Sequence, residues 1–435
     1  MIKKIKSLLN NEIFSKGLIA LLFKILGGIF GYVFLLLVTR TAGAEIWGVF
    51  SLCLALISIS SIFSIMGIDI SLVKFIATFK SQLSNIKDLY IRSVKIISIS
   101  SIFISIMLFF LSDLIANNIF NKSFLAEYFK ITSCFILPFS IISVNAQTLR
   151  GMKKIMEFAL FKHMLRFLFP IICFLLIVNY TDYSVRIAPI FAFLFSIFFL
   201  FLLSTIYTNK IVFTREKVKR KIKTNKLISS SIPMMISASI ILTMSWADTL
   251  MIGIFLPGTD QVGIYNGGLR LAMITSVILE SINSIVAPKI SESYNNGNLK
   301  VFKQVVRYST KLIFLSTFPV FCLLFFFPEF ILSFLGDEFI SAKYVLMILL
   351  LAKLIDSISG SVGVILQMTG CQKIFQNIVF VALIVNIILN MFLIPKFGIE
   401  GAAISSACSI ILWNISAVIY VYRKFGVWSF FNFKK

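Results

Sequence analysis

Seven ionisable side chains inside long apolar stretches of the sequence, and Asp69 near the end of one, are candidates for binding ions, because charge is costly there. Placing one charged side chain at the centre of a bilayer costs about 2.5 kcal/mol or more, so such groups persist where they meet water, a partner or a ligand. The cations are Lys24, Arg166, Arg270 and Lys353. The acids are Asp69, Asp248, Glu280 and Asp356. We predict that the cations line a hydrated cavity and bind an anion, while the acids hold a coupling ion or orient the cations.

Simpler structural roles compete with this interpretation. Lys353 and Asp356 are three residues apart, so they can neutralise each other on one helix. Asp248 and Arg270 belong to consecutive apolar stretches and can pair across two helices. Lys24 and Arg270 have no acid three or four residues away, which makes them the preferred candidates for binding an anion.

Other residue types used in catalysis form no comparable pattern. His163 is the only histidine and lies near the start of its apolar stretch, which favours an interfacial position over proton relay. The six cysteines form no C-x-x-C pair, and we interpret them as small packing residues. The sequence contains no G-x-x-x-x-G-K-[ST], H-E-x-x-H or G-x-S-x-G motif. We therefore expect no metal, no cofactor and no catalytic residue, so the chain is not expected to be an enzyme.

The elements that position these charges are apolar segments long enough to cross a membrane. The hydrophobic fraction is 59% and the mean hydropathy is +0.98. About 20 apolar residues span a bilayer as a helix. We expect twelve such helices, at 18–38, 46–66, 94–112, 124–148, 158–178, 187–207, 228–252, 264–286, 311–334, 344–368, 376–394 and 401–421. The fold class is therefore an all-α membrane protein, with too little chain left for a soluble catalytic domain.

Positive charge alternates between the connections of these segments. The formal net charge is +23, and Lys and Arg concentrate near the N-terminus, in every second connection and near the C-terminus. The positive-inside rule then predicts that both termini and the basic segment 208–227 are cytoplasmic. This topology accounts for the charge without a nucleic-acid partner and brings the basic loops close to anionic membrane lipid.

Two short motifs suggest that the chain contains a duplication. Gly43–Phe50 and Gly258–Tyr265 share glycines and an aromatic or apolar ending, and each precedes an apolar segment. Further matches follow in the same order, pairing Lys74 with Lys289, Arg92 with Arg307 and Gly151 with Gly370. We predict two six-helix bundles, 1–207 and 228–435, joined by the linker 208–227. Because each bundle has an even number of spans, the repeats should be parallel, as in many secondary transporters.

Small and amide side chains inside the spans indicate helix contacts. Gly27 and Gly31 are four residues apart, which fits either close helix packing or a bend beside a cavity. Asn386 and Asn390 are also four apart, and we expect them to form hydrogen bonds between helices rather than a ligand site.

Six segments, taken in order, resemble a known family. They are Thr39–Phe50, Met66-Gly67-Ile68-Asp69, Pro233 with Asp248, Gly263-Ile264-Tyr265, Pro288-Lys289-Ile290-Ser291, and Asn386 to Ala403 with its Leu393-Ile394-Pro395-Lys396-Phe397-Gly398 core. In these segments, spread over nearly the whole chain, the protein resembles the bacterial polysaccharide-export flippases. These are the Wzx-type members of the MOP superfamily, which also contains the MATE transporters and the lipid II flippase.

This resemblance implies a fold, a substrate and a location. The fold would be a V-shaped pair of bundles with a cationic central cavity, in which Arg270 and Asp356 correspond best to cavity positions of the family. The substrate would be an undecaprenyl-pyrophosphate-linked oligosaccharide for O-antigen, lipopolysaccharide or capsule. It would move from the cytoplasmic to the periplasmic leaflet of the bacterial inner membrane by alternating access. The implied partners are membrane lipid, H⁺ or Na⁺ as coupling ion, and a polysaccharide polymerase.

The expected helix count separates relatives within the superfamily. The lipid II flippase has fourteen helices, so twelve favour a repeat-unit flippase. A multidrug cation antiporter of the same superfamily is the main alternative, and it would be expected to have an acidic cavity. A membrane polysaccharide polymerase is a weaker alternative, because such an enzyme needs a long external loop and the external loops here are short.

Overall fold

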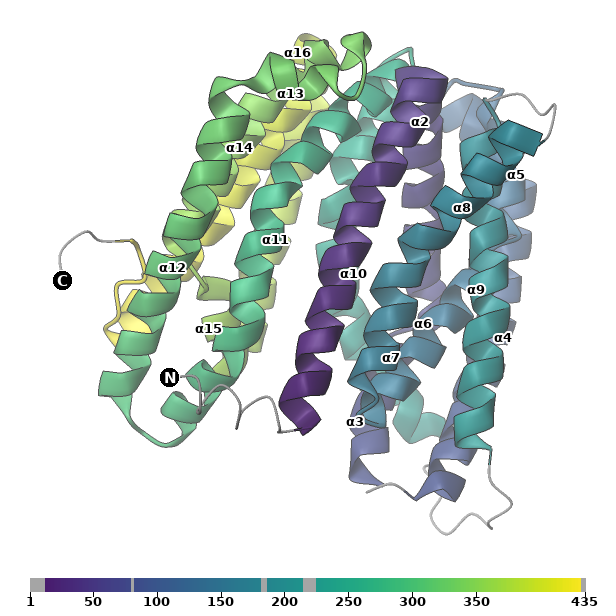
Figure 1. Ribbon diagram of the computed structural model, residues 1–435. Helices are drawn as coiled ribbons and strands as arrows, with labels where there is room; N and C mark the ends of the chain where they lie inside the picture. Colours follow the sequence, from purple (N-terminus) through teal and green to yellow (C-terminus); the bar gives the residue numbers. More distant parts are fainter. Residues whose placement is uncertain (1–11, 80–81, 181–185, 214–223, 432–435) are drawn as a thin grey trace. The chain divides into compact units, whose positions relative to one another are not determined.

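The computed structural model describes residues 12–79, 82–180, 186–213 and 224–431, and all the regular elements in these ranges are helices (Figure 1). The all-α fold class predicted from the sequence is confirmed. Most of the expected linker, residues 214–223, and the terminal residues 1–11 and 432–435 lie outside the described residues. The division into 1–207, 208–227 and 228–435 therefore stays a prediction.

The described part of the chain up to Phe255 forms eleven helices. They are α2 (Glu12–Ile65), α3 (Ile68–Thr78), α4 (Leu83–Leu114), η1 (Ile115–Ile119), α5 (Leu125–Ser133), α6 (Ile136–Gly151), α7 (Ile155–Ala159), η2 (Leu160–Met164), α8 (Leu165–Tyr180), α9 (Ala188–Val212) and α10 (Thr224–Phe255). The elements η1 and η2 are single π-helical turns.

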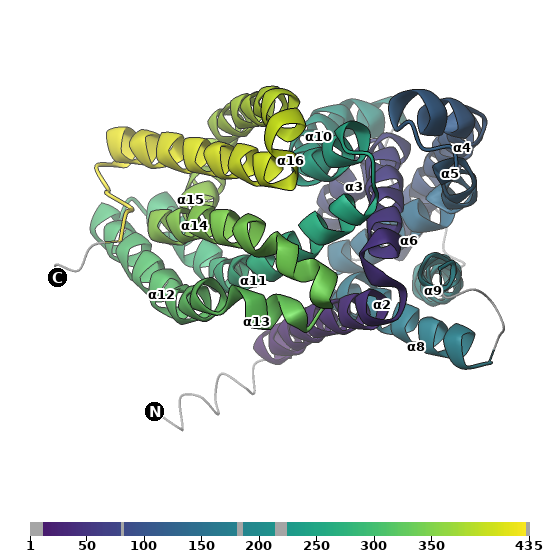
Figure 2. The same cartoon turned by 90° about the horizontal axis from the view of Figure 1, so that it is seen from above.

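The second part continues with further helices. They are α11 (Asp260–Asn295), α12 (Leu299–Phe326), α13 (Pro328–Ser333), η3 (Asp337–Ala342), α14 (Lys343–Ser359), α15 (Val362–Met368) and α16 (Gln372–Phe425). The helices α14 and α16 lie side by side when the molecule is seen from above (Figure 2).

Residue contacts divide the chain into two compact units. The first contains the chain up to Ala42 and then Leu52–Ser239; the second contains Gly43–Ser51 and the chain from Ile240 onward. A short piece of α2 and the second part of α10 thus belong to the second unit.

Helix lengths agree with multiple membrane crossings. Among the described residues, eight helices are long and apolar enough to span a bilayer, and ten if the bent pairs α5–α6 and α14–α15 each count as one. The helices α2 and α16 each contain 54 residues, about 80 Å at 1.5 Å per residue, against ~30 Å of hydrocarbon. Each is interrupted by a non-helical glycine, Gly43 or Gly398. Counting both halves of each gives the twelve segments expected from the sequence.

The break in α2 at Gly43 is stabilised by the carboxylate of Glu338. Gly43 has φ 76°, a conformation open to glycine because it has no Cβ. The next residue restarts the helix, and its amide donates to Glu338 Oε2 of η3 at 2.9 Å. A carboxylate at a helix N-terminus satisfies an unpaired N–H and complements the helix dipole. The chain has turned back by the time it reaches α3 (Figure 1). The expected connection between 38 and 46 is thus one glycine rather than a loop.

Apolar side chains pack inside each unit and also face outward. In the first unit, Ile68, Leu72, Ile86 and Val144 form a buried cluster of α3, α4 and α6. A cluster in the second unit joins α11, α12, α15 and α16. Large apolar side chains remain exposed elsewhere, as with Phe110 at 76%. Such exposure is expected when lipid rather than water surrounds the helices.

The two copies of the repeated motif touch each other. A Cβ on Gly48 would strike the carbonyl oxygen of Thr259, and a Cβ on Gly263 would strike that of Ala44. The contact is reciprocal. Gly48 approaches Thr259, four residues before Gly263, and Gly263 approaches Ala44, four residues before Gly48. Backbones this close need glycine at both positions, as in other tightly packed membrane helices.

Candidate functional site

Asp248 lies at the centre of a buried hydrogen-bond network in the second unit. It is 5% exposed on α10. Its Oδ1 accepts from Nδ2 of Asn386 at 3.1 Å and of Asn390 at 2.7 Å, both on α16. Its Oδ2 accepts from the Tyr265 hydroxyl of α11 at 2.5 Å and also contacts the Ser406 hydroxyl of α16. Three helices therefore converge on one carboxyl group.

The donors around Asp248 can accommodate two protonation states. The Nδ2 atoms of Asn386 and Asn390 can only donate, so Asp248 Oδ1 must accept from both. The hydroxyls of Tyr265 and Ser406 can donate or accept, so Oδ2 can be bare or can carry a proton. In addition, Asn390 Oδ1 is buried and accepts no hydrogen bond within the described part of the chain. The site can thus hold a proton, and it offers oxygen atoms to a small cation.

The sequence explains how this network forms. Asn386 and Asn390 are four residues apart, so they share one face of α16. The break at Gly398 lies between them and Ser406, which allows the second half of α16 to return a hydroxyl to the same carboxyl. The prediction that both asparagines form hydrogen bonds between helices is confirmed. All four partners are neutral, and the alternative pairing of Asp248 with Arg270 is not among these bonds.

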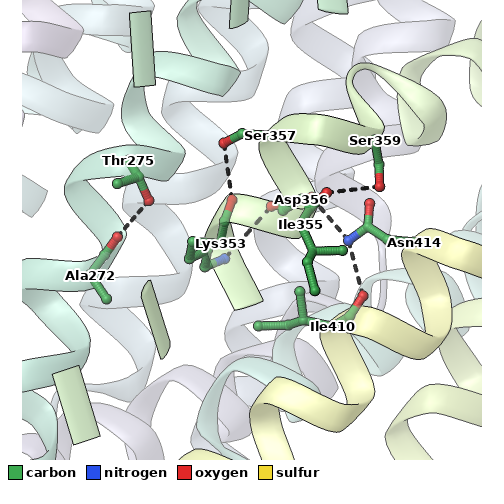
Figure 3. Close-up of polar contacts among 9 residues, drawn as sticks. All are labelled: Ala272, Thr275, Lys353, Ile355, Asp356, Ser357, Ser359, Ile410 and Asn414. Atoms are coloured by element: carbon green, nitrogen blue, oxygen red, sulfur yellow. Dashed lines mark hydrogen bonds and ion pairs between the residues drawn. The ribbon is translucent and has the colours of Figure 1, made fainter. Parts of the chain in front are cut away.

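A second polar group in the same unit surrounds Asp356, which is 8% exposed (Figure 3). Lys353 Nζ lies 3.9 Å from Asp356 Oδ2, so the predicted pair on one helix does form, at the long end of ion-pair distances. Asn414 Nδ2 of α16 donates to Asp356 Oδ1 at 3.1 Å and to the Ile410 carbonyl at 3.0 Å. The lysine and the amide satisfy different oxygens of the same carboxylate.

The helix that carries Asp356, α14, ends three residues after it, at Ser359. Ser357 and Ser359 donate to the carbonyls of Lys353 and Ile355 (Figure 3). The Gly360 amide donates to the Asp356 carbonyl at 3.2 Å. Gly360 has φ 74°, and α15 then leaves at a bend of 46°. The Asp356 group thus lies in the last turn of α14, next to the bend between α14 and α15.

Cations gather within the first unit. His163 of η2 is within electrostatic reach of Lys24 on α2, of Lys162 on η2 and of Arg166 on α8. Lys162 also interacts with Arg166, with Arg150 of α6 and with the carboxylate of Asp69 on α3. We call Lys24, Arg150, Lys162 and Arg166 the basic cluster. Asp69 is the acid that interacts with Lys162, and it also accepts from Ser143 Oγ at 3.4 Å.

Close packing brings α2 against the basic cluster. A Cβ on Gly27 would lie 2.5 Å from the His163 carbonyl oxygen. A Cβ on Gly31 would lie 3.5 Å from Cδ1 of the Phe167 ring, an ordinary van der Waals contact. Of the two alternatives for this glycine pair, close packing is therefore correct. The Arg166 guanidinium lies 4.8 Å from the centre of the Phe139 ring, a cation–π contact that holds the charge on an aromatic face.

The remaining predicted site residues are placed as follows. Lys24, Arg166 and Arg270 are partly buried, whereas Glu280 on α11 is exposed. Each of these four takes part in at least one polar, ring or electrostatic interaction. The structure brings Lys24, Arg166 and Asp69 together in the first unit, and Lys353 with Asp356 in the second. Within the described residues, no group of three His, Cys, Asp or Glu residues could hold a metal ion.

Several residues of these networks were not predicted as site residues from the sequence. Tyr265 and Ser406 complete the Asp248 network, Asn414 binds Asp356, and Lys162 joins the basic cluster. Lys162 lies four residues before Arg166, a spacing that would have paired them on one face. The hydroxyl and amide partners carry no such signal, because similar residues occur throughout the spans.

Comparison with known proteins agrees with this architecture. The family model described as polysaccharide biosynthesis protein matches residues 13–294, and the MatE model matches residues 233–392. The probable low-salt glycan biosynthesis flippase Agl15 of Haloferax volcanii is 31% identical over 38% of this chain and 35% of its own. The putative O-antigen transporter of Shigella flexneri is 27% identical over 36% of this chain and 37% of its own. The alignments thus cover little more than a third of these relatives.

Solved structures show the same fold at low sequence identity. The lipid II flippase MurJ in its inward closed conformation has a TM-score of 0.76 and 16% identity, covering 93% of this chain and 87% of its own. A MATE family multidrug resistance transporter in an inward-facing conformation has a TM-score of 0.69 and 13% identity, covering 94% of each chain. The polysaccharide biosynthesis protein model matches more than half of the sequence, so the chain belongs to that family, and its long apolar helices make it a multi-pass membrane protein.

Proposed function

We propose that the protein moves undecaprenyl-pyrophosphate-linked oligosaccharides from the cytoplasmic to the periplasmic leaflet of the bacterial inner membrane by alternating access. The observation that carries this proposal is the basic cluster in the first unit. Three cations on membrane-spanning helices, Lys24, Lys162 and Arg166, lie within reach of one histidine, and Asp69 supplies one negative charge beside them. An excess of positive charge inside a bilayer is stabilised by an anionic substrate.

The chemistry of the substrate fits this cluster. Every polar group that leaves water for hydrocarbon without a hydrogen bond costs several kcal/mol, so a pyrophosphate and its sugars cannot cross unaided. Lys and Arg side chains replace that hydration with charge-assisted hydrogen bonds, which are about twice as strong as neutral ones. The polyprenyl chain can meanwhile stay in the lipid. We assign Lys24 and Arg166 to this role and retain Arg270 and Lys353 as candidates in the second unit.

We assign ion coupling to Asp248. Its carboxyl group can exist with or without a proton while keeping its four neighbours, which is the property a coupling acid requires. The oxygens of Asn386, Asn390 and Ser406 would also suit Na⁺ beside the same carboxylate. Asp69, Glu280 and Asp356 are secondary candidates. In this proposal the two termini are cytoplasmic, as the basic connections favour.

The test uses charge removal inside the basic cluster. In a strain that lacks its own copy, Lys24→Gln and Arg166→Gln should each reduce surface polysaccharide about ten-fold, since one hydrogen bond to a charged group is worth ~1.5–3 kcal/mol. Lipid-linked oligosaccharide should accumulate on the cytoplasmic face, measured by its resistance to an impermeant reagent added outside. Lys24→Arg should retain export.

Lys130→Gln is the matched control, because Lys130 pairs with the exposed Asp113 at 2.7 Å and lies outside the basic cluster. Export should be unchanged in this variant. Full surface polysaccharide in a correctly inserted Lys24→Gln/Arg166→Gln double variant would contradict the assignment of the basic cluster to substrate binding.

A multidrug cation antiporter is the second candidate function. The MatE match over residues 233–392 and the buried carboxyl of Asp248 favour it. It predicts that deletion sensitises cells to cationic dyes such as ethidium, with surface polysaccharide unchanged. The flippase proposal predicts the opposite pattern, so both readouts from one deletion strain separate the two functions.

A further inference from the structure

A cavity in the first unit shares Arg150 with the basic cluster, and its five other lining residues have no part in the transport proposal. Its volume is about 270 Å³, far more than the ~10–15 Å³ that one water molecule needs. It is lined by Ile70, Val73 and Lys74 of α3, Gln147 and Arg150 of α6, and Met234 of α10. One side of the lining is apolar, and the other carries two cations and an amide.

Both cations are available to a ligand. Lys74 and Arg150 are exposed, and neither forms an ion pair with a carboxylate of the described residues. The Arg150 guanidinium lies 5.4 Å from the centre of the Phe158 ring, which restricts its position. Two cations at one opening attract an anion, and Arg can bind a phosphate through two parallel hydrogen bonds.

Gln147 supplies an independent indication of a ligand. Its side chain is 5% exposed, and its Oε1 is buried and receives no hydrogen bond from any described residue. A buried acceptor without a donor costs ~1–3 kcal/mol, so native proteins rarely leave one unpaired. A ligand hydroxyl in this cavity would donate the missing hydrogen bond.

The order of the helices places the cavity near one membrane surface. Lys74 lies in the connection after the second span, Arg150 ends the fourth, and Met234 lies near the start of the seventh. An even number of spans separates these points, so all three lie on the same side, where the basic connections concentrate. Basic pockets between helices on this side are typical binding sites for lipid headgroups.

We propose that this cavity binds a phosphate ester that carries a hydroxyl group and an apolar chain, with phosphatidylglycerol as the representative ligand. The phosphate contacts Lys74 and Arg150, the glycerol hydroxyl donates to Gln147 Oε1, and the first carbons of the chain lie against Ile70, Val73 and Met234. Because Arg150 also interacts with Lys162, the bound negative charge reduces repulsion within the basic cluster. Binding here does not depend on which substrate the protein transports.

The test measures binding of short-chain lipids to the purified full-length protein in neutral detergent by calorimetry. Four ligands separate the contributions: dioctanoyl phosphatidylglycerol, dioctanoyl phosphatidylmethanol without the hydroxyl, dioctanoyl phosphatidylcholine without net charge, and glycerol phosphate without the chains. Lys74→Gln and Arg150→Gln remove one charge each, and Gln147→Met removes the acceptor at similar volume. Lys210→Gln is the matched control, an exposed cation at the end of α9 on the same side.

We expect the wild type to bind phosphatidylglycerol more tightly than phosphatidylmethanol by about five-fold, the value of one neutral hydrogen bond, and to bind phosphatidylcholine weakly. Lys74→Gln and Arg150→Gln should weaken both anionic lipids about ten-fold. Gln147→Met should weaken only phosphatidylglycerol, to the level of phosphatidylmethanol.

Glycerol phosphate identifies the source of the ligand. If it binds as tightly as the lipid, the proposed contact with an apolar chain is overturned and the ligand is a soluble phosphate ester; if it binds weakly, the ligand is a membrane lipid. The proposal is overturned if Lys74→Gln and Arg150→Gln bind like Lys210→Gln, or if phosphatidylcholine matches phosphatidylglycerol. Because Lys74 is exposed, its variant tests the proposal even if Gln147→Met does not fold.

Discussion

Replacing Asp248 by alanine should destabilise the protein strongly, whereas replacing it by asparagine should leave its stability nearly unchanged. Alanine removes the acceptor of two amide groups, Nδ2 of Asn386 and of Asn390, at a buried position. Each buried donor left unpaired costs ~1–3 kcal/mol, so Asp248→Ala should destabilise the protein by about 2–6 kcal/mol. Loss of the bonds from the Tyr265 and Ser406 hydroxyls adds less to this destabilisation. The Ser406 hydroxyl, for example, can turn and donate to a carbonyl of its own helix.

Asparagine preserves the pattern of donors and acceptors. Its Oδ1 can accept from Asn386 and Asn390, while its Nδ2 can donate to the Tyr265 and Ser406 hydroxyls, which then act as acceptors. We therefore expect Asp248→Asn to stay within about 1 kcal/mol of the wild type. If Asp248 is the coupling acid, the same variant should lose transport, because an amide cannot carry the proton or the charge.

The assay is thermal unfolding of the purified protein in detergent, followed by loss of the monodisperse peak on size exclusion. Asp113→Asn is the control, since its side chain is 58% exposed and its pair with Lys130 should contribute at most about 1 kcal/mol. Equal destabilisation by Asp248→Asn and Asp248→Ala would refute the donor–acceptor assignment. Full export by Asp248→Asn would refute the coupling role alone.

Further substitutions test the packing of the helices. Gly27→Ala should lower the melting temperature, because its Cβ would lie 2.5 Å from the His163 carbonyl oxygen, at a cost of about 1–3 kcal/mol. The adjacent Gly28→Ala has open space and should be neutral or stabilising by up to ~1 kcal/mol; equal melting of the two variants would show that α2 does not pack on η2 in this way. Glu338→Ala should cost about 0.5–2 kcal/mol through loss of the bond from the Ala44 amide, and Glu338→Gln less; an unchanged melting temperature in Glu338→Ala would contradict this role.

Hydropathy predicted most of the fold, because hydrocarbon leaves helices as the means of satisfying the backbone in these apolar segments. The breaks inside the segments could not be predicted in the same way. We expected connections around Gly43 and Gly398, but each is a single glycine with positive φ. A hydropathy window averages over about 20 residues and cannot distinguish a loop from one residue that reverses or kinks the helix.

The polar networks were predictable where they lie within one helix. Asn386 with Asn390 and Lys353 with Asp356 have helical spacing, which predicts a shared face. Tyr265 and Ser406 reach Asp248 through tertiary packing that no local spacing encodes. In the first unit, the π-helical turn η2 precedes Arg166 and shifts the direction of the side chains around it, an insertion that a 3.6-residue period does not anticipate.

The contact between Gly48 and Gly263 has a consequence for the history of the chain. Each copy of the motif meets the other through the same residues, so the contact has the self-complementary form of a two-fold dimer interface. Such an interface does not require the motifs to be covalently joined, so two half-length polypeptides could form it as a homodimer. In the single chain the two glycines depend on each other, because a side chain gained at either position pushes against the opposite backbone.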